Sequence, residues 1–384
     1  MGVVGVILSF LAIELLLRVI EWTPAWKVLP VVERELGWPD PDLGYALRPS
    51  LEIINVRENR ARPTTNSLGM RDRERVRIKL AADYRVILTG DSFTEALQVE
   101  DHETFAHLAE LEVNAGRQTQ QVELLNFGMS GAGPVQQLVR AQLSVQEFSA
   151  DALVMVININ QFLTEEMSND SINPAYVEDA NGALGLGYAF RQRRSQRLRD
   201  SIVGALFFVL MDHSRILRAA YLRYAQGAVP SVAGTQRADF RDVRSCTPLN
   251  QPLARQAELW QERSPTGAAS RVTRFLNDVA TLSKVTGVQS AIIFFGLGEP
   301  NAQCFDVAAR RASLMSYIET ILASQSIKMW DAENYISSEL GGYETASELR
   351  GFGSYIGTGH LNRMGHQVYA RLLSSVVNEL MDAQ

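Results

Sequence analysis

Cysteine and histidine are both scarce in this sequence. The 384 residues include two cysteines, Cys246 and Cys304, and five histidines. No Cys-x-x-Cys pair or Cys/His group has the spacing of zinc ligands, so we expect no metal site and no other cofactor. The two cysteines could form a disulfide in an exported domain or remain two separate buried thiols. Both interpretations stay open at this stage.

Positive charge is not in excess either. The chain has 37 Lys and Arg residues against 43 Asp and Glu residues, which gives a formal net charge of −6. A surface with this balance has no broad attraction for a polyanion, so we expect no nucleic-acid partner. No internal repeat or long low-complexity tract occurs. The length is sufficient for one large α/β domain with additional segments.

The longest apolar run lies at the N-terminus. Residues 2–20 are apolar except for Ser9, Glu14 and Arg18. Nineteen residues at ~1.5 Å each span about 28 Å, close to the ~30 Å hydrocarbon core of a bilayer. The segment has neither the basic start nor the small-residue cleavage site of a signal peptide. We therefore predict a single-pass membrane anchor over residues 1–22.

Two charges within this run need an explanation. Glu14 and Arg18 are four residues apart and can pair on one helix face. A carboxylate that faces lipid is costly, so Glu14 suggests a membrane-protein partner. Trp22 and Trp26 are expected at the membrane interface.

From residue 84 onwards, short apolar strands alternate with helices. Strands are predicted over 85–89, 122–127, 152–159, 289–295 and 327–330, and amphipathic helices over 104–113, 134–145, 272–285, 308–324 and 366–381. This alternation predicts a three-layer αβα, flavodoxin-like fold with a parallel five-stranded sheet. We expect residues 84–384 to form this domain and residues 23–83 to form a β-rich lead-in that packs on it.

A long insertion, at about residues 162–270, separates the third and fourth strands. It contains a basic stretch at 191–199 and an apolar helix at 202–210. We expect the arginines to form a solvated helix face, with acidic lipid headgroups or a polyanion as the alternative ligand. The apolar helix is predicted to pack on the core rather than on a membrane.

Polar and small residues follow the predicted strands at the sheet edge where ligands bind in open parallel sheets. Ser92 follows the first strand at a turn into a helix, where its hydroxyl can be exposed. Gly131 follows the second strand, and its N–H can be approached closely because it has no side chain. Asn160 follows the third strand and carries a carboxamide donor. Of the five histidines, His360 is best placed to act as the base for a serine nucleophile.

These motifs resemble those of the SGNH/GDSL hydrolases. The matching segments are Gly90-Asp91-Ser92, Asn126-x-Gly128-x-Ser130-Gly131, Asn160 and His360-Leu361-Asn362-x-x-Gly365-His366. The lead-in also resembles that of membrane-anchored bacterial members, through Gly44-Tyr45-x-x-x-Pro49 and Asn66-Ser67-x-Gly69-x-Arg71. The resemblance implies that Ser92 is the nucleophile and His360 the base. It implies oxyanion donors in the Ser92 amide, Gly131 and Asn160, and a periplasmic or otherwise extracytoplasmic domain.

Two departures from the family pattern bear on activity. The family has an aspartate two or three residues before the histidine, but Thr358 and Gly357 stand there. The missing carboxylate could come from Asp331, Glu339 or Glu348, or a Ser–His dyad could act with a backbone carbonyl holding the imidazole. In addition, Asn158-Ile159-Asn160-Gln161 lacks the glycine that usually precedes the asparagine and the aspartate that usually follows it.

Two main functions are compatible with the sequence. The first is a membrane-anchored esterase or deacetylase that acts on an ester or acetyl group of an envelope carbohydrate or lipid. The second is a catalytically impaired domain, a pseudoenzyme that serves as an accessory subunit of a membrane protein complex. An acyltransferase that uses the same serine is a third and weaker interpretation, because no acyl donor is indicated.

Overall fold

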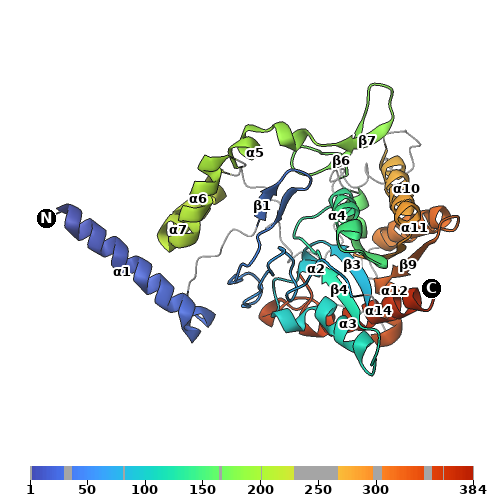
Figure 1. Cartoon of the computed structure of the whole chain (residues 1–384), viewed down its shortest axis with the longest axis horizontal. Helices are drawn as coiled ribbons and strands as arrows, with labels where there is room; N and C mark the ends of the chain where they lie inside the picture. The colour runs from blue at the N-terminus through green and yellow to red at the C-terminus, as the bar shows by residue number, and fades with distance from the viewer. Residues whose placement is uncertain are drawn as a thin grey trace.

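A five-stranded parallel sheet forms the centre of the globular domain in the computed structural model (Figure 1). The model describes residues 2–29, 37–80, 83–163, 167–199, 201–228, 267–296, 305–340, 348–357 and 359–383. The strand order is β4-β3-β5-β8-β9. The strands are β3 (Tyr84–Gly90), β4 (Val122–Asn126), β5 (Ala152–Asn158), β8 (Gln289–Phe295) and β9 (Ile327–Asp331). The predicted parallel five-stranded sheet is confirmed.

Helices cover both faces of this sheet, which confirms the predicted three layers. One face carries α4 (Pro134–Glu147), α10 (Ala268–Thr286) and α11 (Phe305–Leu322). The other carries α3 (Phe105–Asn114), α12 (Ala332–Leu340) and α14 (Arg363–Met381). Figure 1 shows the two groups on opposite sides of the strands.

The strands read as continuous apolar runs because both of their faces are buried. In β3, Val86 and Leu88 enter the core beneath α3 and α14, whereas Ile87 enters the core beneath α4 and α10. Successive side chains of a strand point to opposite faces, so a strand with two covered faces is apolar along most of its length. The strands β4, β3 and β5 are neighbours and run parallel, so their carboxyl ends meet at one edge of the sheet.

The lead-in begins with a short antiparallel hairpin of β1 (Gly37–Asp40) and β2 (Gly44–Leu47) and continues as irregular chain with isolated bridges. Its attachment to the sheet is polar. The guanidinium of Arg75, which is almost fully buried, donates to Glu110 at 2.6 Å, to Asp72 at 2.8 Å and to the Leu124 carbonyl at 2.9 Å. The lead-in is therefore joined both to α3 and to the edge strand β4.

The described part of the insertion after β5 contains a hairpin and three helices. The hairpin is β6 (Ala175–Glu178) with β7 (Leu184–Gly187), and the helices are α5 (Arg194–Arg199), α6 (Ile202–His213) and α7 (Arg215–Ala228).

Short 3₁₀ helices occur at several places along the described chain: η1 (Pro24–Lys27), η2 (Asp101–Glu103), η3 (Ile159–Leu163), η5 (Ala189–Gln192) and η6 (Gly353–Tyr355). Both cysteines lie outside the described residues.

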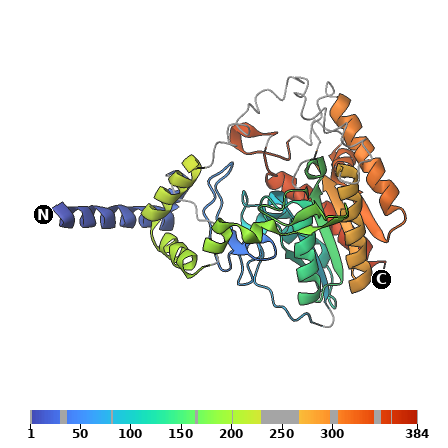
Figure 2. The same ribbon diagram turned by 90° about the horizontal axis from the view of Figure 1, so that it is seen from above.

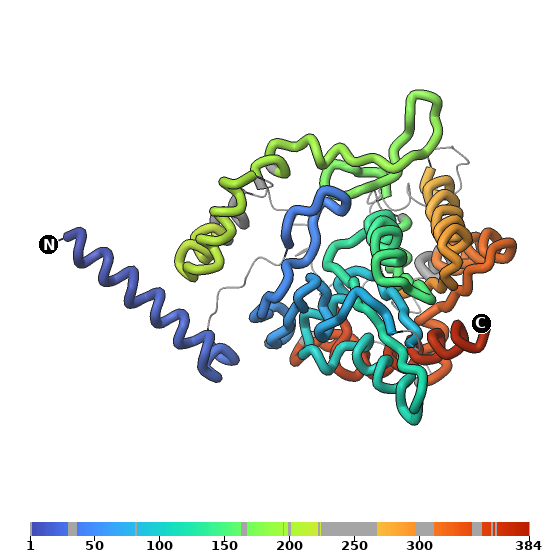
Figure 3. The backbone as a smooth tube through the Cα atoms, in the orientation of Figure 1, coloured from blue at the N-terminus to red at the C-terminus, as the bar shows by residue number. Residues whose placement is uncertain are grey.

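The prediction that the apolar helix of the insertion packs on the core is wrong. In α6 only Gly204, Phe208 and Met211 are buried, and they form a single stripe. The backbone tube in Figure 3 shows α6 and α7 at the side of the domain that faces the N-terminal helix. Most of the large apolar residues of α6 stay exposed, because a helix at the periphery of the domain buries only one stripe of its surface.

The N-terminal run forms α1 (Gly2–Trp22), a helix of 21 residues that by length and composition alone could cross a membrane. The predicted Glu14–Arg18 pair is present, with an N···O distance of 3.1 Å. Trp22 is exposed, but Trp26 is buried with the Arg62 guanidinium 4.7 Å from its ring centre. Only one of the two predicted interfacial tryptophans is therefore free to meet lipid.

Candidate active site

Ser92 opens the short helix α2 (Ser92–Glu95) directly after β3. The side chain of Asp91, and not that of Ser92, caps this helix by accepting a hydrogen bond of 2.9 Å from the Phe93 N–H. Because capping falls to Asp91, the Ser92 hydroxyl remains available for another contact. The close strand-to-helix turn holds Ser92 at the carboxyl end of the sheet, partly exposed.

The imidazole of His360 makes that contact. Its Nε2 lies 2.7 Å from Ser92 Oγ, and its ring packs against Phe93 with the centroids 5.0 Å apart. The backbone beside it is tied by the Gly351 N–H, which donates to the His360 carbonyl at 2.9 Å. The sequence-based choice of His360 as the histidine beside Ser92 is thus met by the geometry.

His366, by contrast, has a structural environment. It is fully buried, and the Phe105 N–H donates to its Nδ1 at 3.2 Å. Burial lowers the pKa of His366 to about 3, so the imidazole is neutral and joins α14 to α3.

A carboxylate does meet His360, and it comes from the lead-in. Glu58 Oε1 lies 2.6 Å from His360 Nδ1, and the His360 backbone N–H donates to Glu58 Oε2 at 2.8 Å. Neither of the two alternatives that the sequence left open is met: the carboxylate is not that of Asp331, Glu339 or Glu348, and no carbonyl takes its place at His360 Nδ1. Asp331, for example, is paired with the Arg311 guanidinium at 2.6 Å.

A tight loop presents Glu58 to the imidazole. Glu58 itself has a left-handed backbone, with φ of 57°. The Asn55 carboxamide nitrogen donates to the carbonyls of Arg57 and Asn59, each at 3.0 Å, and Asn59 in turn donates to the Gln98 carbonyl at 2.7 Å. These bonds hold a conformation that a non-glycine residue adopts only when its surroundings impose it.

Gly359 leaves the space that the Glu58 carboxylate occupies. It has a φ of +80°, and a Cβ atom at this position would lie 2.5 Å from Glu58 Oε2. Any side chain here would push the carboxylate away from the backbone N–H of His360. The glycine before the histidine therefore belongs to the same arrangement.

Electrostatics favour an ionised Glu58. Partial burial alone would raise the pKa of its carboxyl, but the hydrogen bonds from the His360 ring and amide outweigh burial and hold that pKa below its usual value. An anionic acceptor at Nδ1 keeps the ring proton on that nitrogen. His360 Nε2 is then the atom that can accept the proton of Ser92.

The loop after β4 carries Gly131 and is held from two sides. The Tyr45 hydroxyl of the lead-in donates to the Ser130 carbonyl, and the Ser130 N–H donates to Glu95 Oε2 at 2.6 Å. Gly131 is exposed and has a φ of 75°, which favours glycine. The loop therefore offers an accessible backbone N–H on a supported turn.

Glu95 and Tyr45 were not anticipated from the sequence, although both lie in quoted motifs or next to them. Glu95 is fully buried on α2, and burial raises the pKa of its carboxyl to about 7 in spite of the hydrogen bonds from Ser130. Tyr45 belongs to the Gly-Tyr-x-x-x-Pro segment of the lead-in. That segment thus has a definite contact, which is the carbonyl next to Gly131.

Asn160 lies in η3, just beyond the carboxyl end of β5. Its backbone N–H donates to Asn158 Oδ1 at 3.1 Å, so the side chain that replaces the usual glycine supports the asparagine. Among the described residues no hydrogen bond joins Asn160 or Gly131 to Ser92. Their role as oxyanion donors stays a prediction, since such donors meet an oxygen of the substrate.

Several solved structures are similar to this chain at low identity. LAE5, an α/β hydrolase enzyme from the metagenome of Lake Arreo, is 15% identical, with 77% of this chain and 96% of that chain covered and a TM-score of 0.38. The esterase EstA from Pseudoalteromonas sp. is 8% identical, with 78% and 100% covered and a TM-score of 0.39. A member of the lipolytic G-D-S-L family from Veillonella parvula DSM 2008 is 10% identical, with 76% and 97% covered and a TM-score of 0.36.

No protein-family model matches the chain, and no curated protein matches it. At the identities and TM-scores above, the solved structures say nothing about the role of any residue. What the site can do chemically follows from its own contacts, which are those among Ser92, His360 and Glu58.

Proposed function

We propose that this protein is a serine ester hydrolase of the SGNH type. The observation that carries the proposal is the continuous contact from Ser92 Oγ to His360 Nε2 at 2.7 Å and from His360 Nδ1 to Glu58 at 2.6 Å. A serine hydroxyl is a weak nucleophile until a base removes its proton, and the base works best when a third group orients it.

The reaction runs in two steps. Ser92 Oγ attacks the carbonyl carbon of the ester while His360 Nε2 takes the hydroxyl proton. The tetrahedral intermediate then expels the alcohol, which receives that proton, and leaves an acyl group on Ser92. Water, deprotonated by His360, attacks the acyl carbonyl, and the acid leaves as Ser92 regains its proton. Glu58 stays ionised throughout and stabilises the imidazolium that forms in each step.

The negative oxygen of each intermediate needs donors close by. We assign the Ser92 amide, the Gly131 amide and the Asn160 carboxamide to this role. Removal of one such donor typically lowers kcat about 10²- to 10³-fold. The supports of the Gly131 loop by Tyr45 and Glu95 favour this assignment, because a preorganised donor does not have to reorient during the reaction.

The substrate we propose is an ester or acetyl group of an envelope carbohydrate or lipid, reached by a domain that α1 anchors in the membrane. Retention of α1 is favoured by its polar contacts with the rest of the chain. Glu14 accepts a hydrogen bond of 2.9 Å from the Arg215 N–H, and Glu21 accepts one of 2.6 Å from the Arg215 guanidinium. Removal of α1 as a signal sequence would take away both carboxylates that Arg215 contacts.

The alternative of an impaired accessory subunit loses two of its supports. Its first motive was the missing acid, and Glu58 occupies that place. Its second motive was the charge within α1, and Arg18 and Arg215 of the same chain pair with that charge.

A fluorophosphonate probe tests the proposal directly. It should label the full-length protein in detergent, and Ser92→Ala should abolish both labelling and hydrolysis of an aryl acetate. Ser144→Ala, which changes a buried serine on α4, is the matched control and should leave both intact. Equal labelling of the Ser92 variant, or a wild-type protein that is inert at high probe concentration, would contradict the assignment.

A further inference from the structure

The insertion holds an apolar surface that the proposed hydrolase chemistry does not use. Helix α6 has the sequence Ile-Val-Gly-Ala-Leu-Phe-Phe-Val-Leu-Met-Asp-His, in which polar side chains are confined to the last two positions. Its exposed large side chains are Ile202, Val203, Leu206, Phe207, Val209 and Leu210. A helix that is apolar all around but buried along only one stripe exposes a hydrophobic face, and such a face is unfavourable in water.

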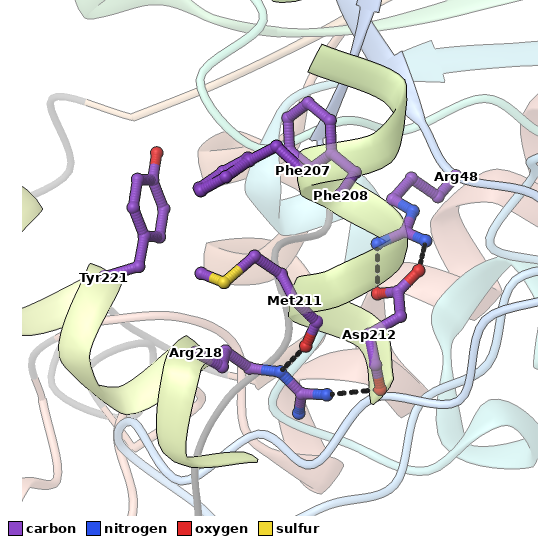
Figure 4. Close-up of a pocket in the computed structure, with 7 residues that line it drawn as sticks. All are labelled: Arg48, Phe207, Phe208, Met211, Asp212, Arg218 and Tyr221. Carbon is purple, nitrogen blue, oxygen red and sulfur yellow. Dashed lines mark hydrogen bonds and ion pairs between the residues drawn. The ribbon is translucent and has the colours of Figure 1, made fainter. Parts of the chain in front are cut away.

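The buried stripe shows which side of α6 faces the protein. Phe208 packs on Trp38 with the ring centroids 5.1 Å apart, and Asp212 forms a bidentate ion pair with Arg48 of the lead-in. Figure 4 shows Phe207, Met211 and Tyr221 around a small cavity between α6 and α7. That cavity measures about 10 Å³, which is room for about one water, so it is no ligand site.

The turn between α6 and α7 is attached to α1. Glu14 accepts hydrogen bonds from the backbone N–H groups of Arg215, at 2.9 Å, and of Ile216, at 3.3 Å, which places its carboxylate at the N-terminus of α7. The Arg215 side chain donates to Glu21, which lies about two helical turns after Glu14 on α1. The α6–α7 hairpin is thus joined to α1 between Glu14 and Glu21.

This attachment sets the depth of the hairpin once α1 crosses a bilayer. The part of α1 that precedes Glu14, residues 2–13, is about 18 Å long, which falls short of a hydrocarbon core of ~30 Å. Figure 2 shows this part projecting alone, with α6 and α7 beside the base of α1 only. If α1 spans the bilayer, the stretch from Glu14 to Trp22, which is about 12 Å long, must therefore lie in the bilayer as well. The turn between α6 and α7, which is hydrogen-bonded to Glu14, must enter with it.

We infer that α6 is a second membrane-contacting element, whose exposed face lies against the acyl chains of the leaflet next to the globular domain. The inference rests on the membrane anchoring proposed above. The charges at the attachment satisfy one another, as charged groups at this depth require. Leu198 on α5 and Leu217 on α7, the helices that precede and follow α6 in the sequence, are exposed as well.

Charge next to α6 suits a lipid surface. Arg193, Arg194 and Arg197 are exposed at the start of the segment that leads into α6. Arginines beside an apolar helix are placed to meet anionic headgroups. The combination of an apolar face, a basic flank and continuity with α1 favours lipid over another protein as the occupant.

Photo-crosslinking of the wild-type chain tests this inference. The protein is reconstituted in vesicles of phosphatidylcholine and phosphatidylglycerol that include a phosphatidylcholine with a diazirine on its acyl chain. Trypsin cuts after Arg199 and Arg215, so the peptide 200–215 isolates α6. The peptide 1–18 reports on α1, and the peptide 86–117, which carries the exposed Leu111 of α3, is the control.

We expect lipid adducts on 1–18 and on 200–215 but not on 86–117. Adducts on 1–18 without adducts on 200–215 would overturn the inference and leave the anchor in place, and this result would also follow if the chain itself or a second copy covered α6. Adducts on neither peptide would remove the anchor and the inference together, whereas labelling by the fluorophosphonate probe would be unaffected.

A residue-level measurement complements the peptides. A single Leu206→Cys label in a chain with Cys246 and Cys304 replaced by serine should lose most of its NBD fluorescence to lipids brominated on their acyl chains. Leu111→Cys in the same background is the matched control, because Leu111 is 57% exposed and Leu206 is 59% exposed. Equal quenching at the two sites would contradict the inference, and fluorophosphonate reactivity confirms that each labelled chain is folded.

Discussion

At the scale of single residues, Glu58 decides whether the site can work as a triad. It lies 302 positions from His360 in the sequence, and both oxygens of its carboxylate meet that residue. A carboxylate placed in this way keeps the imidazole in the tautomer that can accept the serine proton. Its contribution can be measured separately from that of Ser92.

Glu58→Gln should lower kcat about 10³- to 10⁴-fold with little change in KM, because the amide can stabilise the wrong tautomer of His360. The analogous change in a serine protease lowers kcat about 10⁴-fold. Steady-state hydrolysis of an aryl acetate measures the effect. Glu52→Gln in the same lead-in, where the carboxylate is mostly exposed and pairs with Arg62, is the control and should behave as wild type. An unchanged kcat in the Glu58 variant would show that Ser92 and His360 act as a dyad without help from Glu58.

Glu95 is the second residue whose ionisation matters. Its folded-state pKa of about 7 lies above the ordinary value of 4.5, because burial disfavours the anion. The stability that this group contributes is therefore complete below about pH 4.5 and is lost as the pH rises through 7. Each pKa unit between the folded and unfolded chain corresponds to about 1.4 kcal/mol, which sets the effect on the order of 3 kcal/mol.

Glu95→Gln should remove this pH-dependent loss of stability, because the glutamine side chain does not ionise. Its side-chain carbonyl can still accept the hydrogen bond from the Ser130 N–H. Denaturant unfolding at pH 4.5 and pH 8 should show the variant gaining stability relative to wild type only at the higher pH. Parallel pH profiles for the two proteins would mean that Glu95 is not the group that titrates.

At the scale of structural elements, the lead-in hairpin supports the loop after β4. The Tyr45 ring packs beside Leu47, Met129 and Ala132, and its hydroxyl donates to the Ser130 carbonyl. Tyr45→Phe keeps the packing and removes the hydrogen bond. We expect kcat to fall about tenfold through poorer positioning of the Gly131 N–H, with about 1 kcal/mol or less lost in stability.

Tyr317→Phe is the matched control for this prediction. The Tyr317 hydroxyl lies 2.8 Å from Thr273 Oγ1, in the layer of α10 and α11 and away from Ser92. Its loss should affect stability to a similar degree and leave kcat unchanged. Equal falls in kcat for both variants would show that Tyr45 has no particular role in the loop.

At the scale of the whole molecule, the lead-in stays on the sheet through buried ion pairs. Arg75 satisfies Asp72 and Glu110 at once, and burial raises the pKa of Asp72 to about 6 even with Arg75 beside it. Removal of one partner from a buried pair leaves an uncompensated charge and typically costs about 3–5 kcal/mol.

Arg75→Ala should therefore lower the free energy of unfolding by about 3 kcal/mol or more, measured by urea denaturation in detergent. It should also reduce activity, because the lead-in that it holds carries Glu58. Arg77→Ala removes an exposed pair with Glu147 and should change stability by less than about 1 kcal/mol. Comparable losses from the two variants would contradict the anchoring role of Arg75.

How much of this could be predicted from the sequence depends on the range of the interactions concerned. The five strands and the helices on both faces were predictable, because apolar periodicity is a local property that each segment carries by itself. Ser92 and His360 were predictable from short motifs at the ends of those elements. The same motifs could not show whether a carboxylate would reach His360.

The errors share one cause. Glu58 sits in an irregular loop without periodicity, and only the folding of the lead-in brings it to a residue 302 positions away. The α6 helix was expected in the core because it is apolar, but a sequence does not say which surface an apolar helix meets. Its attachment to α1 through Glu14 and Arg215 joins residues about two hundred positions apart.

The sequence by itself therefore determined the αβα sheet, the apolar N-terminal helix and the Gly90-Asp91-Ser92 and His360 motifs, because local patterns encode local structure. Only the tertiary structure decided that Glu58 completes the contact with His360, that Tyr45 and Glu95 hold the Gly131 loop, and that α6 turns its apolar face outwards. These outcomes depend on contacts between distant segments, whose partners are selected by packing and by the pairing of buried charge.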